Sequence, residues 1–197
     1  MQNFSLFFYY LYKFSNSLFG GIALGTIFVI YTPLPVKTYS IGGILLTLGA
    51  FLLTLFYTKL IQAKPYKKIL VFVEILPFLY VLAFLFFPNT FKGAILVYAL
   101  YQFSFIFGDY LMRSETLIFN QKRILAHFDK LKQIGYLVGL FLAFCFYSIL
   151  EFLEIKDKIL QVYYLHFALL LIQCFVFTAL IISLNPKERK NSAKDTF

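Results

Sequence analysis

Ionisable side chains stand inside an apolar stretch of this chain, residues 93–119. Asp109 and Arg113 are four residues apart, a spacing that brings two side chains together on a helix and lets opposite charges pair. An ionisable group inside a membrane span costs about 3 kcal/mol or more, so it marks a functional candidate. A carboxylate can take up a proton and an arginine can hold an anion. The pair could therefore bind a solute or couple its movement to protons.

The same stretch predicts a polar stripe along one helical face. At 100° per residue, six polar side chains project within about 40° of one direction. They are Tyr98, Gln102, Asp109, Arg113, Thr116 and Asn120. Glu115 points nearly the opposite way, so we expect it to meet a basic loop or a neighbouring helix. The stripe either lines a polar cavity between helices or serves only packing and anchoring, and the sequence leaves both interpretations open.

A weaker polar face runs along the first apolar stretch, 4–32. Its members are Tyr9, Lys13, Asn16, Ser17 and Gly20. Lys13 either extends its long side chain to the membrane interface or reaches a carboxylate such as Asp109 or Glu74. We take five residues from the two faces as candidates for a solute path: Lys13, Asn16, Gln102, Asp109 and Arg113.

Proton coupling has three weaker candidates, Asp109, Glu74 and His166. His166 lies about two turns into the last apolar stretch. A lone histidine inside a membrane is more often an interhelical hydrogen-bond partner than a proton relay. Gly21 with Gly25, and Gly135 with Gly139, form G-x-x-x-G pairs that predict close helix packing and nothing more.

Several sequence motifs of enzymes are missing. The chain has no phosphate-binding G-x-x-x-x-G-K-(S/T), no H-E-x-x-H, no G-x-S-x-G and no aspartate-rich cluster. We therefore expect no catalytic residues, no cofactor and no metal site, and interpret the protein as something other than an enzyme.

The elements that must position these residues are membrane helices. With 61% hydrophobic and 14% charged residues, 197 residues cannot bury their apolar surface in one soluble core. Crossing about 30 Å of hydrocarbon takes about 20 helical residues, and barrel strands would instead alternate over about ten. We predict an all-α polytopic bundle of six transmembrane helices within residues 1–186. Their ranges are 4–32, 40–62, 69–87, 93–119, 131–150 and 159–184.

The basic residues predict the orientation of these helices. Thirteen lysines and arginines fall after the second stretch, around the end of the fourth and in the tail, four fall in the other gaps, and Lys13 lies within the first stretch. The positive-inside rule then places both termini in the cytoplasm, with 187–197 as a basic cytoplasmic tail. We expect an integral protein of the bacterial inner (plasma) membrane in contact with lipid. Because the charges are spread over separate short loops, we expect no nucleic-acid partner.

The layout resembles the N-terminal half of a major facilitator superfamily (MFS) transporter. That superfamily often carries the motif G-x-L-x-D-R-x-G-R-(R/K)-x-x-L between its second and third helices, and the stretch 58–70 keeps Leu60, Lys67 and Leu70. The segment 115–119, followed by a basic loop and two glycines, is similar to the region joining helices four and five. The tail from Leu184 to Arg189 is similar to the start of the central loop.

The resemblance implies that the first and fourth helices face a central cavity and that a complete transporter has twelve helices. We therefore expect a half-size secondary transporter or permease for a small solute. It would form a homodimer or pair with another six-helix half. Two alternatives remain open: a membrane subunit of a multi-protein importer, and a non-transport scaffold or assembly factor.

Overall fold

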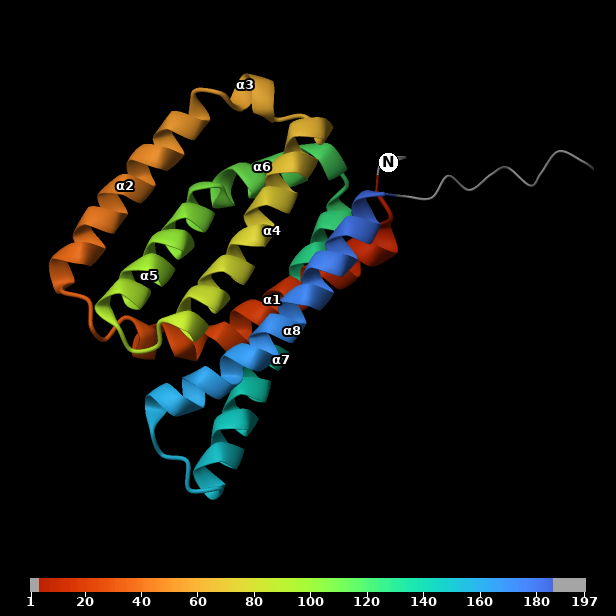
Figure 1. The fold of residues 1–197 in the computed structure, drawn as a ribbon. Helices are drawn as coiled ribbons and strands as arrows, with labels where there is room; N and C mark the ends of the chain where they lie inside the picture. The colour runs from red at the N-terminus through yellow and green to blue at the C-terminus, as the bar shows by residue number, and fades with distance from the viewer. Residues whose placement is uncertain (1–3, 186–197) are drawn as a thin grey trace, which may run out of the picture.

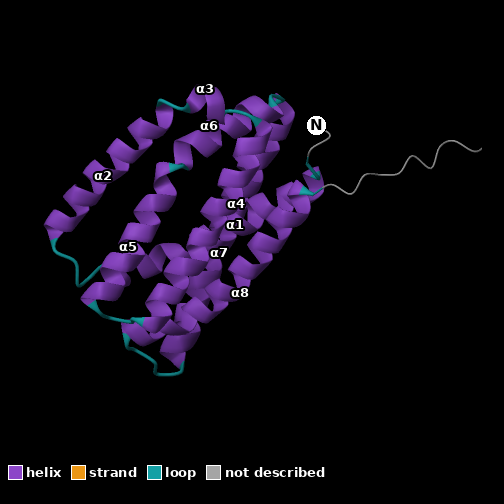
Figure 2. Cartoon of the chain, turned by 45° about the horizontal axis from the view of Figure 1, so that its top comes forward, coloured by secondary structure: helices purple, strands orange, loops and turns teal. Residues whose placement is uncertain are grey.

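The computed structural model describes residues 4–185, so the tail expected at 187–197 lies outside the described residues. The described part forms eight helices and no strand. The helices are α1 (Leu6–Ile30), α2 (Val36–Thr54), α3 (Tyr57–Leu60), α4 (Ala63–Phe86), α5 (Phe91–Ile106), α6 (Gly108–Phe119), α7 (Lys122–Phe152) and α8 (Lys158–Leu184). Figure 2 shows short loops joining them at the two ends of the bundle.

Six spans in this part of the chain are long and apolar enough to cross a membrane. In chain order, spans 1 to 6 are α1, α2, α4, α5 together with α6, α7, and α8. The protein is therefore an all-α polytopic membrane protein, and lipid surrounds its apolar surface. The first and last described residues lie at the same end of the bundle, where the Ser5 N–H donates to the Ser183 carbonyl oxygen at 2.8 Å.

Two helices differ most in length from the apolar stretches. Span 2 ends at Thr54 because α3 forms a separate turn and Gln62 then adopts an extended backbone before α4. α7 begins at Lys122, nine positions before the apolar stretch at 131, because a helix can continue past the apolar segment with polar residues on its exposed side.

Span 4 is interrupted at Phe107. α5 ends at Ile106 and α6 begins at Gly108, and the Phe107 N–H donates to the Ser104 carbonyl at 3.3 Å, a tighter turn than an α-helix makes. Residues on either side of this break no longer follow one helical phase. The polar stripe predicted along a single helix is therefore divided between two.

Three glycines allow α1 and α7 to pack at close range. A Cβ on Gly21 would collide with the Tyr136 carbonyl of α7, and one on Gly139 with the Leu18 carbonyl of α1; Gly135 lies equally close to Phe14. Backbone contact of this kind needs residues without side chains. The packing role predicted for these three glycines is confirmed.

The spans pack in a repeated pattern. Span 1 packs against spans 5 and 6, span 4 packs against spans 2 and 3, and spans 3 and 6 contact each other. Exchanging span 1 with span 4, span 2 with span 5 and span 3 with span 6 leaves these five contacts unchanged. The smaller contacts of span 5 with spans 4 and 6 have no counterpart of similar extent between span 2 and spans 1 and 3. Figure 1 shows the resulting order, with α2, α5 and α4 side by side and α8 and α1 following.

Candidate functional site

A partly buried ion pair joins α1 to α6 towards the end of the bundle that holds the first and last described residues. Lys13 Nζ lies 2.6 Å from Glu115 Oε1, with side chains 19% and 14% exposed. Lys13 is about 10 Å along the helix from Leu6, which places it inside the span. The Glu115 contact with a neighbouring helix is the one predicted, whereas the Lys13 partner is neither Asp109 nor Glu74.

Two tyrosines extend this ion pair. The Tyr9 hydroxyl donates to Glu115 Oε1 at 2.6 Å and lies 2.5 Å from the Tyr66 hydroxyl of α4. Because Tyr9 has a single hydroxyl proton and gives it to Glu115, the Tyr66 hydroxyl must be the donor to Tyr9. We call Lys13, Glu115, Tyr9 and Tyr66 the Glu115 network; it connects α1, α4 and α6.

A second network surrounds Glu74 on α4, whose residue is 4% exposed. Its Oε1 accepts from the Tyr12 hydroxyl at 2.6 Å and from Asn16 Nδ2 at 2.7 Å. Gln173 of α8 donates from Nε2 to the Glu74 carbonyl at 2.9 Å and to Oε2 at 3.3 Å. Within residues 4–185 Glu74 has no ion-pair partner. We call these four residues the Glu74 network.

The Glu74 network has the parts of a proton-binding site. A carboxylate only accepts hydrogen bonds, whereas a carboxylic acid also donates one. Gln173 Oε1 is buried and has no partner, so rotation of that amide would present an acceptor to a protonated Glu74. The two networks are neighbours on α1, where the Tyr9 and Tyr12 rings are 5.5 Å apart between centroids.

A groove of about 400 Å³ lies between spans 1, 4 and 5 and is open on one side. Its lining is Gly20, Leu24, Ile27, Tyr31, Tyr101, Gln102, Phe105 and Tyr136. None of these side chains is charged. Gln102 is the one candidate of the predicted solute path that lines this groove.

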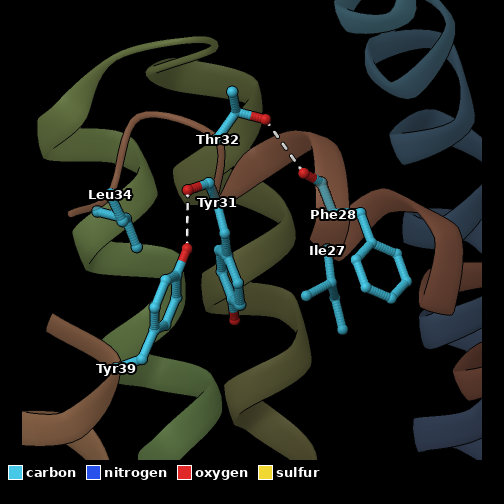
Figure 3. Close-up of a pocket in the computed structure, with 6 residues that line it drawn as sticks. All are labelled: Ile27, Phe28, Tyr31, Thr32, Leu34 and Tyr39. Carbon is cyan, nitrogen blue, oxygen red and sulfur yellow. Dashed lines mark hydrogen bonds between the residues drawn. The ribbon is translucent and has the colours of Figure 1, made fainter. Parts of the chain in front are cut away.

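Tyrosines hold spans 1, 2 and 4 together at the end of the bundle opposite the first and last described residues. The Tyr31, Tyr39 and Tyr98 rings pack on one another with centroids 5.3 to 6.2 Å apart. The Tyr39 hydroxyl donates to the Tyr31 carbonyl at 3.0 Å, and this contact borders a second pocket of about 330 Å³ (Figure 3). Spans 1 and 4 thus meet at this tyrosine cluster and at Lys13–Glu115, with the groove between the two contacts.

The remaining candidates lie outside both networks and the groove. Asp109 and Arg113 are exposed on α6, and no ion pair within the described residues joins them. His166 is buried, with Nδ1 2.7 Å from the Val162 carbonyl and its ring 4.2 Å from Phe84. None of the hydrogen bonds or ion pairs found for His166 reaches Glu74 or Asp109.

Sequence reasoning missed the tyrosines that complete the site. Tyr12 directly precedes Lys13, a member of the predicted polar face of α1. Tyr66 precedes Glu74 by about two helical turns, a spacing that could have placed Tyr66 and Glu74 on the same face of α4. Tyr101 and Tyr136 gave no such signal, because tyrosine is common throughout this chain.

Metal binding has no support in the described part, where no group of three or more His, Cys, Asp or Glu residues could hold an ion. The arrangement offers an uncharged groove, a buried carboxylate at Glu74 and a partly buried one at Glu115. Comparison with protein-family models, with curated proteins and with solved structures finds no match for this chain.

Proposed function

We propose that the protein is a half-size secondary transporter, in which the groove between spans 1, 4 and 5 forms one wall of a solute cavity. The observation that carries this proposal is the groove itself. It is open on one side, and spans 1 and 4, which border it, touch at both of its ends. A second copy or another six-helix chain would supply the opposite wall.

The repeated packing pattern supports the same proposal. Spans 1–3 cross the membrane three times, so span 4 starts on the opposite side from span 1. The unit of spans 4–6 therefore has the opposite orientation to the unit of spans 1–3. Inverted units of this kind are nested within each six-helix half of MFS transporters. The main contacts of spans 1–3 correspond to those of spans 4–6, and such a duplication would produce this correspondence.

Proton movement is the driving force that fits the polar residues best. Glu74 is buried among three donor side chains with an unpartnered amide oxygen beside it. Protonation there changes the hydrogen bonds that join α1, α4 and α8. A proton taken up at Glu74 can therefore alter how span 1 packs, and span 1 borders the groove.

The assembly state tests this proposal. The tagged full-length chain is purified from native membranes into lipid nanodiscs, and the mass of the intact complex is measured. We expect a homodimer or a one-to-one complex with another six-helix chain. A chain that is strictly monomeric without a partner contradicts the proposal, and a soluble ATPase partner would make it an importer subunit.

The orientation belongs to the same proposal, with both termini in the cytoplasm of a bacterial cell. Cys145 and Cys174 are first replaced by serine, and Lys64→Cys and Lys156→Cys are then made separately. A membrane-impermeant maleimide added to intact cells should label the Lys156→Cys variant and leave the Lys64→Cys variant unlabelled. The reverse result would invert the topology.

A further inference from the structure

We infer that the groove binds an uncharged solute in which a ring carries hydroxyl or amide groups, and that Gln102 is its central polar contact. That this solute is also carried across the membrane rests on the proposed transport function. The inference concerns the chemical class of the ligand, which the resemblance to transporters leaves open.

The charge of the ligand follows from the lining. The groove has no carboxylate and no basic side chain among its eight lining residues. The nearby ionic groups of the Glu115 network already neutralise each other, with Lys13 Nζ 2.6 Å from Glu115 Oε1. An ion brought into this groove would be desolvated without a counter-charge, which is strongly unfavourable in a medium of low dielectric constant. A neutral ligand avoids that cost.

The polar groups of the ligand follow from unpartnered groups of the protein. The Gln102 side chain makes no hydrogen bond to any residue of 4–185, and its Oε1 is buried. The hydroxyls of Tyr31, Tyr101 and Tyr136 also have no hydrogen-bond partner among residues 4–185. An amide and three hydroxyls offer both donors and acceptors without charge. A buried polar group of this kind is normally satisfied, and rotation of the Gln102 amide would let a ligand in the groove supply the missing partner.

The shape of the ligand follows from the aromatic walls. Tyr31, Tyr101, Phe105 and Tyr136 line the groove together with Gln102, and the Tyr80 ring of α4 packs against the Tyr101 ring with centroids 5.1 Å apart. Flat aromatic faces bind rings by stacking and by edge contacts. A volume of about 400 Å³ lies within the range of pockets that hold small molecules.

Photolabelling tests this inference with three probes that share one ring and differ in charge. The probes are 4-(trifluoromethyl-diazirinyl)benzyl alcohol, the corresponding benzoate, and the corresponding benzyltrimethylammonium ion. Each is irradiated with the full-length protein in lipid nanodiscs, with and without excess unlabelled analogue. Labelled positions are then mapped by peptide mass spectrometry.

We expect saturable labelling by the alcohol at residues 24–31 and 101–105 and none by the two ions. Gln102→Leu should raise the half-saturating concentration about three- to tenfold, the effect of losing one hydrogen bond. Gln133→Leu makes the same change at an exposed position of α7 and should have no effect. Tyr136→Phe removes only an unpartnered hydroxyl and should weaken labelling about threefold without disturbing the fold.

Three results overturn the inference. These are tighter saturable labelling by either ion, equal labelling of wild type and both groove variants, and no saturable labelling by any probe. The first changes the class of solute but leaves a solute-binding groove. A monomer without a partner in the mass measurement would instead contradict the transporter while leaving the binding result intact, so the two failures are distinguishable.

Discussion

The ion pair between Lys13 and Glu115 should contribute measurably to stability. Lys13→Met leaves Glu115 with one donor, Tyr9, and Glu115→Gln leaves Lys13 buried without a counter-charge. Exposed pairs contribute at most about 1 kcal/mol, whereas breaking a fully buried pair costs about 3–5 kcal/mol. With side chains 19% and 14% exposed, we expect each single variant to lose about 2–3 kcal/mol.

The double variant separates the pair from its surroundings. The protein with both substitutions has no unpaired charge at this site. It should therefore be about 1–2 kcal/mol more stable than the sum of the two single losses predicts. Stability is measured by titrating sodium dodecyl sulfate into mixed micelles and following helix content by circular dichroism. Lys130→Met and Glu151→Gln, at exposed positions of α7, provide matched controls that should change stability by less than about 0.5 kcal/mol.

This comparison of the single and double variants has a clear negative result. If the losses of the two single variants add in the double variant, the two charges do not interact, and the pair does not hold span 1 to span 4. If the controls lose as much as the single variants, the effect belongs to the loss of any charged side chain and not to this pair. Either result would refute the reasoning.

Three further expectations can be measured in the same assay or alongside it. Tyr12→Phe should cost about 1.5–3 kcal/mol because its hydroxyl donates to a buried carboxylate, whereas Tyr10→Phe, whose hydroxyl has no such partner, should be nearly neutral. Gly139→Ala should cost about 1–3 kcal/mol by overpacking the contact between α1 and α7, whereas Gly43→Ala, where a methyl group meets nothing, should be neutral or slightly stabilising. Asp109→Asn should leave stability within about 0.5 kcal/mol, since the side chain is exposed; if it also leaves transport of an identified solute unchanged, Asp109 is not part of the solute path.

The sequence predicted the six-helix architecture well because apolar length is a direct consequence of membrane thickness. Span 6, expected at 159–184, is observed at Lys158–Leu184. The packing glycines were predictable for a similar reason, since only a residue without a side chain permits backbone contact. Both signals lie within single helices and need no knowledge of how the helices are arranged.

The partner of Lys13 could not be predicted in this way. Its choice among three carboxylates depends on the break at Phe107, which changes the direction in which residues of α6 point relative to those of α5. Nothing in the apolar pattern of 93–119 marks that break. Lys13 and Asn16 were thus correctly identified as unusual, but their partners Glu115 and Glu74 depend on packing between helices distant in sequence.

The central position of α1 has a consequence for synthesis of the protein. Its main packing partners are α7 and α8, which are synthesised after the other described helices, and Tyr9 lies 106 residues before its acceptor Glu115. Until α6 is inserted, α1 is therefore in the membrane with its lysine unneutralised. Until α7 is inserted, the glycine face of α1 is uncovered. Chains that stop before α6 expose both features to the insertion machinery and to membrane proteases, which makes such early termination products recognisable as incomplete.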